Sequence, residues 1–343
     1  MNKKNILLIG SGRRAQSVIL PALYCLKDSF DLTAIYSRSI KNLSMFNDSW
    51  KLTTINDLGK IDFTKLDLII IAVTLDAVPE ILQKLSSYPV EHITLMIDTP
   101  VLPHNKLGAI KYFSSFKKVL ISEDSIALPQ YVLAKRLMNE GRIGRLRRIY
   151  LWHSGYKFHA LASIKYLTGA SYIKSIRSRN LGNGIFEKTI KLSNGVIVHM
   201  LEPRDYSVGR FLIIGESGLI ADYPLLGHNS YYIDCVEKNN IYSGLMLNNI
   251  LQPEDFLDKI YSDNIPGDLS ARNLRTSLKV RGFMSLVTAA GEENSLYRYE
   301  PIAGLYDMLA IKIADKFGYF RDFPLGVNNS IFGLLLKTLS PFL

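Results

Sequence analysis

Cysteine is scarce in this sequence, which holds only Cys25 and Cys235 among its 343 residues. The two stand far apart, in no CxxC pair and with no spacing to histidine that suits zinc. This scarcity argues against a disulfide framework and favours a reducing compartment. We therefore expect a cytoplasmic protein.

Histidine is sparse as well, with six in the chain. His153, His199 and His228 show no mutual spacing typical of metal ligands. We expect no metal site.

Long apolar runs are also missing. Only a short apolar run lies between Lys4 and Gly10, too short for a signal sequence or a membrane span. The apolar segment 331–343 is broken by Lys337 and Pro341, which favours a docked helix that packs back on the first domain. Contact with a membrane surface is the alternative. We expect no integral membrane segment.

Positive charge is plentiful, since the net charge is +10, but the basic residues are scattered. One dense cluster surrounds a turn and enters an alternating strand; it consists of Arg142, Arg145, Arg147 and Arg148. A solvated basic face or a subunit contact explains this cluster, and a polyanion site is the alternative. We expect no nucleic-acid partner.

The length of the chain favours two domains, and 48% hydrophobic residues suffice to give each a core. No long stretch is of low complexity, so we expect the chain to be folded throughout. We place the boundary between residues 124 and 125, where the alternation of strands and helices changes character.

A glycine motif follows the first apolar run. Asn5-Ile6-Leu7-Leu8-Ile9 is typical of a buried parallel strand, and it leads into Gly10-Ser11-Gly12-Arg13-Arg14-Ala15. In a G-x-G-x-x-A turn the first glycine allows the tight turn, the second admits a pyrophosphate, and the alanine lets helix and strand pack closely. The helix start then offers unpaired N–H groups to the phosphates. A purely structural turn is the alternative.

The second predicted strand, 31–36, indicates which dinucleotide binds. It ends in Tyr36-Ser37-Arg38-Ser39, where an NAD site offers a carboxylate to the ribose. Ser37 and Arg38 suit a 2′-phosphate instead, so NADP is favoured over NAD. Arg38 as an ordinary exposed residue is the alternative. Arg13 and Arg14 are further candidates for the phosphates or the adenine face.

Three more strands are predicted in this half, at 66–73, 93–97 and 119–124, with a helix at 78–85. Val73-Thr74 and Asp98-Thr99-Pro100 therefore lie at the carboxyl ends of strands, where open α/β sheets bind ligands. Residues 1–124 are predicted to form a dinucleotide-binding Rossmann domain with a parallel sheet.

Beyond a helix at 128–139, strands follow one another without long helices between most of them. They are predicted at 147–152, 175–180, 185–192, 196–201, 210–214 and 219–223. Ser193-Asn194-Gly195 is a good hairpin turn, and a helix is predicted at 158–167, ended by Gly169. Residues 125–343 are thus predicted to form an α+β domain with an open, mostly antiparallel sheet.

The order of these pieces resembles the glucose-fructose oxidoreductase/inositol dehydrogenase/MocA family. The resemblance covers most of the chain in outline. Besides the two motifs of the first half, it is carried by Ala72-Val73-Thr74, Asp98-Thr99-Pro100, Gly141-Arg142-Ile143-Gly144, His159 with Gly169, and Gly215-Glu216-Ser217-Gly218. It implies a nicotinamide cofactor, a substrate-binding second domain, and a homodimer or homotetramer formed through the open sheet.

Two departures from the family pattern concern catalysis. The family's E-K-P motif supplies a lysine that exchanges a proton with the substrate, whereas Asp98-Thr99-Pro100 has Thr99 at that position. A threonine hydroxyl is too weakly acidic to replace it. Of the family's D-x-x-x-H pair, His159 is kept and Gly155 replaces the aspartate.

The remaining catalytic candidates are His159, Lys157, Tyr156 and Asp98. His159 has the side chain best suited to donate a proton near neutrality, and Lys157 or Tyr156 could replace the missing lysine. Backbone hydrogen bonding by His159, surface roles for Lys157 and Tyr156, and a loop contact for Asp98 are the alternatives.

The leading hypothesis is an NADP-dependent reductase or dehydrogenase acting on a small carbonyl, imine or sugar-like substrate. A cofactor-binding sensor or partner subunit without turnover is the first alternative. A non-redox enzyme that recycles its bound NAD(P) internally is the second.

Overall fold

The structure is a computed structural model of the whole chain, and it describes residues 3–45, 50–205, 208–225, 227, 229–253, 274–291 and 299–321. The predicted C-terminal helix at 331–343 and His228 lie outside these residues. Within the described ranges, no helix combines the length and the apolar character needed to cross a lipid bilayer.

The chain forms two compact units. The first contains Met1–Ala127, Glu237–Tyr242 and Asp255–Leu305, and the second contains Leu128–Val236, Ser243–Glu254 and Tyr306–Leu343. The division of the chain at residues 124 and 125 stays a prediction, and the first unit also contains two segments from later in the chain. One of them brings in helix α6 (Leu274–Ala290), which packs against α1 and the turn at 124–127 and fully buries Phe283 and Val287.

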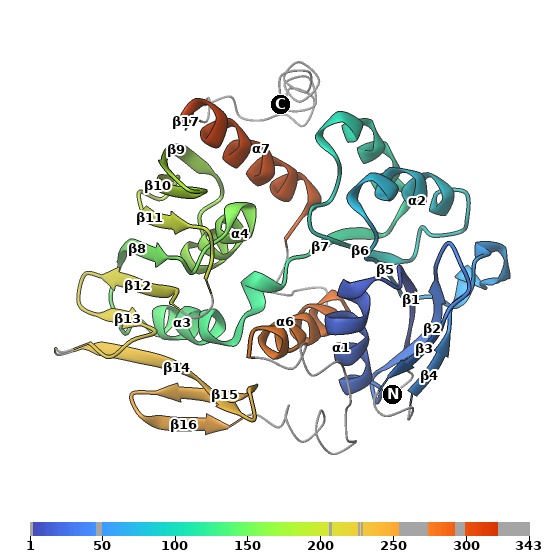
Figure 1. Cartoon of the computed structure of the whole chain (residues 1–343), viewed down its shortest axis with the longest axis horizontal. Coiled ribbons are helices and arrows are strands. Elements are labelled where there is room, and N and C mark those ends of the chain that lie inside the picture. The colour runs from blue at the N-terminus through green and yellow to red at the C-terminus, as the bar shows by residue number, and fades with distance from the viewer. Residues whose placement is uncertain are drawn as a thin grey trace. The chain divides into compact units, whose positions relative to one another are not determined.

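The first unit is built on a five-stranded parallel sheet in the order β2-β1-β5-β6-β7 (Figure 1). The strands are β1 (Lys4–Ile9), β2 (Phe30–Tyr36), β5 (Leu68–Ile71), β6 (Thr94–Asp98) and β7 (Lys118–Ser122). All four strand pairs are parallel, and every residue of β5 is buried. The predicted Rossmann-type sheet is confirmed.

Helices pack on this sheet. The turn after β1 enters a π-helical turn, η1 (Ala15–Ile19), and continues as α1 (Leu20–Cys25), which packs beside α6 (Figure 1). Helix α2 (Val78–Leu85) has the predicted bounds, because four apolar residues at helical spacing are buried while Glu80 and Lys84 pair on its exposed side.

The other elements of the first unit are short or irregular. They are the hairpin of β3 (Asn42–Met45) and β4 (Trp50–Thr53), and the 3₁₀ segments η2 (Leu58–Lys60), η3 (Phe63–Lys65), η4 (Leu75–Ala77), η5 (His104–Ser115) and η6 (Asp124–Ala127).

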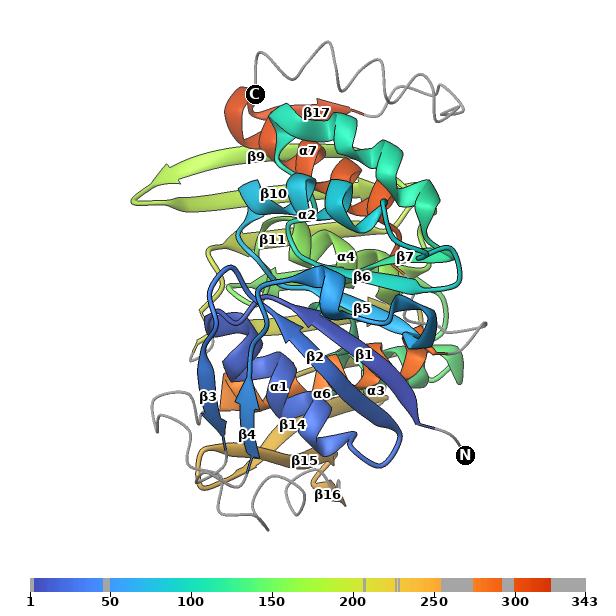
Figure 2. The same cartoon turned by 90° about the vertical axis from the view of Figure 1, so that its right-hand side faces the viewer.

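A ten-stranded mixed sheet forms most of the second unit, in the order β16-β15-β14-β13-β12-β8-β11-β10-β9-β17. The strands are β8 (Leu146–Trp152), β9 (Ile173–Gly182), β10 (Ile185–Leu192), β11 (Ile197–Glu202), β12 (Arg210–Gly215), β13 (Leu219–Ala221), β14 (Ser230–Lys238), β15 (Ile241–Leu247), β16 (Ile250–Pro253) and β17 (Tyr319–Arg321). Figure 2 shows β9 and β10 as a long hairpin.

The predicted open and mostly antiparallel sheet is confirmed, with parallel pairing between β8 and β11 and between β13 and β14. The predicted turn Ser193-Asn194-Gly195 joins the antiparallel strands β10 and β11, and Gly195 has a φ of +86°. The unit also holds α3 (Pro129–Asn139), α4 (Lys157–Thr168) and most of α7 (Pro301–Phe317).

The two faces of this sheet differ. Leu151, Met200 and Phe211 are buried, and Tyr131 of α3 packs 5.5 Å from the Phe211 ring. The residues that alternate with them, such as Tyr150 and Trp152, are half-buried or exposed. One face therefore forms the core with α3 and α4, and the other carries side chains that these helices do not cover.

Candidate functional site

The glycine turn after β1 has the geometry that close approach of a phosphate requires. Gly10 has a φ of +117°, and a Cβ there would lie 2.1 Å from the carbonyl oxygen of Ala72. At Gly12 a Cβ would meet nothing within 4 Å, so this position opens onto space. Ala15 is fully buried where the helix begins to pack on the sheet. The first glycine thus serves the turn, and the second leaves room beside the backbone.

The end of β2 lies beside this turn. The hydroxyl of Ser11 donates a hydrogen bond to that of Ser37 at 3.0 Å, and the backbone N–H of Gly10 donates to the Tyr36 carbonyl at 2.9 Å. Arg38, one residue further, is exposed, as is Arg13. The structure therefore brings the two predicted cofactor motifs together, with the Arg38 guanidinium accessible to a ligand.

The predicted binding residues at the ends of β5 and β6 lie along the same carboxyl edge of the sheet. Val73 is half-buried and Thr74 is exposed. Thr99 and Pro100 are half-buried and are joined by a cis peptide bond.

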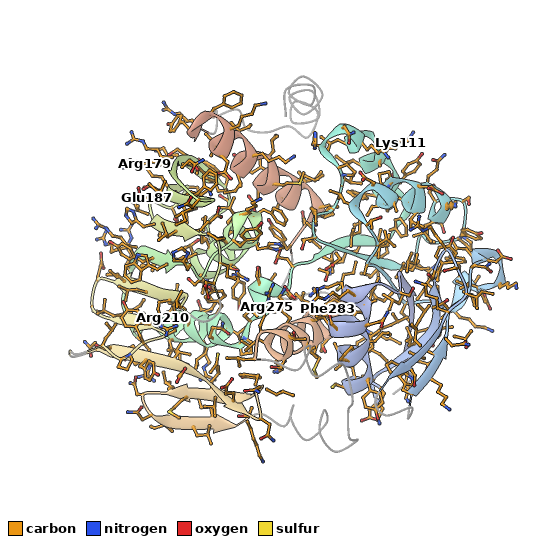
Figure 3. All side chains as sticks on the ribbon, in the orientation of Figure 1. Lys111, Arg179, Glu187, Arg210, Arg275 and Phe283 are labelled. Carbon is orange, nitrogen blue, oxygen red and sulfur yellow. The ribbon has the colours of Figure 1, made fainter. Side chains whose placement is uncertain are left out.

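Arg14 makes a contact that spacing in the sequence does not indicate. Its Nη1 donates to Asp124 Oδ2 at 2.9 Å, and its Nε lies 3.2 Å from Asp98 Oδ2. The guanidinium also lies 5.9 Å from the ring centroid of Phe283 on α6, which Figure 3 labels. Arg14 thus ties the glycine turn to the ends of β6 and β7.

Burial and the neighbouring charges together shift the pKa values of Arg14 and Asp98. Burial would lower the pKa of Arg14, but Asp124 and Asp98 outweigh it and raise that pKa, so the guanidinium remains charged. Burial raises the pKa of Asp98 above its ordinary value, and the positive charge of Arg14 opposes this only in part. Asp98 is therefore a carboxyl group that takes up a proton more readily than an exposed aspartate.

The second unit gathers the other catalytic candidates at the start of α4. The ring centroids of Tyr156 and His159 lie 6.2 Å apart, and Phe158 lies 4.3 Å from His159. The Lys157 ammonium lies 5.3 Å from the Tyr156 ring centroid. Tyr156 and Lys157 are exposed, and His159 is half-buried. The three predicted residues therefore form one accessible group.

Buried charges hold the start of α4 in place. Glu202, at the end of β11, accepts a hydrogen bond from the backbone N–H of Lys157 and pairs through its other oxygen with Lys188. Lys188 is fully buried and also lies 3.0 Å from Asp315 of α7. Glu202 thus takes the role of an N-terminal capping side chain, and Lys188 balances its charge.

Gly155, which the resemblance aligns with the family's aspartate, lies where the core leaves no room for a side chain. A Cβ at this residue would lie 2.8 Å from the sulfur of Met200 and 2.9 Å from Cβ of Ala160. Both distances are shorter than ordinary packing allows. Any larger side chain at position 155 would require the core beneath α4 to move.

Sequence reasoning missed Asp124, Ser122, Glu202 and Lys188. The first two lie in the last part of the strand predicted at 119–124, so their place near the carboxyl end of β7 is a usable signal. Glu202 and Lys188 give no such signal, because their pairing depends on the register of β10 and β11. Among the described residues, no group of three histidine, cysteine or acidic side chains could hold a metal ion.

Comparison with known proteins gives structural matches only. No protein-family model matches the sequence, and no curated protein matches it. Solved structures match nearly the whole chain. Myo-inositol 2-dehydrogenase from Lactobacillus plantarum is 14% identical, covering 94% of this chain and 100% of its own, with a TM-score of 0.58.

Two further structures show the breadth of this likeness. GenD2 from gentamicin A biosynthesis, in complex with NAD, is 13% identical over 94% of this chain and 97% of its own, with a TM-score of 0.59. A super-repressor mutant of Gal80p from Saccharomyces cerevisiae is 13% identical over 93% and 98%, with a TM-score of 0.63.

The chain has the fold of the glucose-fructose oxidoreductase/inositol dehydrogenase/MocA oxidoreductases. The predicted resemblance is confirmed at this level. That Thr99 and Gly155 take the places of the family's lysine and aspartate remains a prediction from the sequence.

Proposed function

We propose that this protein is an NADP-dependent oxidoreductase. The glycine turn carries the proposal, because Gly10 is required for the turn and Gly12 opens onto space at the carboxyl edge of a parallel sheet. A structure of the same fold was solved with NAD bound, which supports a nicotinamide cofactor. Gly10, Gly12 and Ala15 would hold the pyrophosphate side of the dinucleotide.

The preference for NADP over NAD rests on the end of β2. No carboxylate follows Tyr36, and the side chains offered are the Ser37 hydroxyl and the exposed Arg38 guanidinium. An arginine can bind a 2′-phosphate through two charge-assisted hydrogen bonds, whereas the unphosphorylated ribose of NAD gives it no such partner.

The bound cofactor would supply or accept a hydride, and the substrate class is a small carbonyl, imine or sugar-like molecule. His159 is the first candidate to hold the proton that accompanies the hydride, with Lys157 and Tyr156 beside it. Thr99 cannot take this role, because its hydroxyl does not ionise near neutral pH.

A fluorescence titration with NADPH and with NADH tests the cofactor assignment. We expect NADPH to bind more tightly than NADH, and Arg38→Ala to weaken NADPH binding by about 10-fold or more while leaving NADH binding nearly unchanged. Lys51→Ala, which removes an exposed charge from β4, is the matched control and should bind both as the parent does. Failure of the parent protein to bind either nucleotide would refute the assignment.

A second candidate function is a cofactor-binding protein without turnover. It is favoured by Thr99, by the closed packing around Gly155, and by structural similarity to a protein named as a repressor. Oxidation of NADPH that depends on an added carbonyl or imine compound would eliminate this candidate. Product formed without net change in NADPH would instead identify a non-redox enzyme that recycles its cofactor.

We also propose that the uncovered face of the ten-stranded sheet binds a second copy of this chain. Tyr150, Trp152, His199 and Leu212 occupy neighbouring positions on β8, β11 and β12, and Trp152 is 40% exposed. An aromatic face of this kind is typical of an interface. Sedimentation velocity should show a dimer or tetramer that Trp152→Lys shifts toward monomer, whereas a parent protein that sediments as a monomer would contradict the proposal.

A further inference from the structure

Three buried polar atoms at the carboxyl edge of the first unit lack a hydrogen-bond partner among the described residues. They are Nε of Arg14, Oδ1 of Asp98 and Oγ of Ser122. Buried polar groups are almost always satisfied in proteins, so several such atoms in one place indicate a missing polar partner. A ligand group that binds there would make the hydrogen bonds that the protein itself leaves unmade.

The three atoms belong to one place in the fold. Asp98 and Ser122 are the last residues of β6 and β7, and they pair with each other in the parallel register. Residues paired in this way project their side chains to the same face of a sheet. Arg14 reaches the same point, because its Nε lies 3.2 Å from the other oxygen of Asp98 without forming a hydrogen bond.

The chemistry of the three atoms defines the group that fits them. Asp98 Oδ1 is an acceptor, Arg14 Nε is a donor with a positive charge, and the Ser122 hydroxyl can do either. A carboxylate ligand would repel Asp98, and a simple cation would repel Arg14. A neutral group with one N–H donor and one carbonyl acceptor satisfies the set, and that group is a carboxamide.

The order of the strands indicates which end of a bound dinucleotide would lie at this site. The cofactor residues Ser37 and Arg38 follow β2, the glycine turn follows β1, and Asp98 and Ser122 end β6 and β7 at the far side of the sheet. A dinucleotide bound across this edge has its adenine half at β2, so its nicotinamide half lies toward β6.

We propose that Asp98, Ser122 and Arg14 form a carboxamide-binding site that orients the nicotinamide ring of the bound dinucleotide. The assignment rests on the proposed function, and it makes the three residues positioning residues. It also gives a reason for the ion pair between Arg14 and Asp124, which holds the guanidinium beside Asp98.

Binding of a cofactor analogue tests this site without any measurement of turnover. The probes are NADP and its 3-acetylpyridine analogue, in which a methyl group replaces the amide NH₂ and so removes the donor to Asp98. We expect the parent protein to bind NADP at least tenfold more tightly than the analogue, equivalent to about 1.4 kcal/mol. Asp98→Ala should bring the two dissociation constants to within about twofold of each other.

Asp62→Ala is the matched control, since Asp62 is exposed and pairs with Lys65 on the surface of the same unit. It should keep the preference for NADP. Equal binding of the two probes by the parent protein, or an unchanged preference in Asp98→Ala, would overturn the carboxamide site and leave the cofactor assignment standing. Binding of neither probe would overturn both.

Ser122→Ala supplies a second test that does not depend on Asp98→Ala folding. Because the Ser122 hydroxyl is buried without a partner, its removal should not lower the melting temperature of the cofactor-free protein. The same change should reduce the rise in melting temperature that saturating NADP produces. A lower melting temperature without NADP, together with an undiminished rise, would contradict the proposal.

Discussion

Glu202 and Lys188 form an ion pair inside the second unit, where both side chains are buried. The pair joins β11 to β10, and the second oxygen of Glu202 caps the start of α4. The accessible group of Tyr156, Lys157 and His159 therefore depends on a charge pair that lies beneath it.

Removal of one member of this pair should destabilise the protein strongly. We expect Lys188→Met to lower the free energy of unfolding by about 3–5 kcal/mol, because it leaves the Glu202 carboxylate buried without its cation. Urea denaturation followed by circular dichroism measures the change. Lys191→Met, at an exposed position of the same strand, should change the value by no more than about 0.5 kcal/mol. A similar small loss in Lys188→Met would show that the pair contributes little.

Substitution at Gly155 should show that the family aspartate cannot simply be restored. We expect Gly155→Ala to cost about 1–3 kcal/mol, because the new Cβ overlaps Met200 and Ala160. Gly155→Asp should cost more, since it also buries a carboxylate. In a double-mutant cycle with Met200→Ala, the two losses should be less than additive by about 1 kcal/mol. Full additivity would contradict the packing explanation.

Asp222 should make stability depend on pH in the second unit. Burial raises the pKa of Asp222 from 3.8 to about 6, while its carboxylate accepts the backbone N–H of Phe211 at 2.7 Å. The folded state thus holds this proton more strongly than the unfolded state does. The associated stability is present below pH 4 and is lost as the pH rises through 6.

Comparison with Asp222→Asn isolates this effect, because asparagine keeps an acceptor for the Phe211 N–H. Relative to this variant, the parent protein should lose about 2–3 kcal/mol of unfolding free energy between pH 4 and pH 7. Glu187→Gln, an exposed change on β10 opposite Arg179 (Figure 3), should give no comparable difference. A difference between parent and Asp222→Asn that is constant over this range would refute the assignment.

Local patterns in the sequence predict much of the fold. Helix α2 has its predicted bounds because its apolar residues recur at helical spacing. The glycine turn is recognisable because Gly10 is needed for the tight turn and Gly12 leaves open space beside the backbone. The pattern gives no such signal for β14, where burial does not alternate regularly along the strand, or for α6, which joins the first unit from far along the chain.

The candidate site was harder to predict from the sequence, because some of its contacts join residues that are far apart along the chain. Arg14 and Asp124 are 110 positions apart, and only the order of strands brings them together. The group of Tyr156, Lys157 and His159 is local in sequence and could be found, but the support that it receives from Glu202 depends on sheet register.

Titration of NADPH into Gly12→Ala tests the central claim most directly, with the melting temperature as a measure of folding. Because a Cβ at Gly12 meets no protein atom within 4 Å, the variant should melt as the parent does. It should nevertheless bind NADPH at least 10-fold more weakly, because the methyl group occupies the space that the pyrophosphate needs. A variant that folds normally and binds NADPH as tightly as the parent would contradict the account.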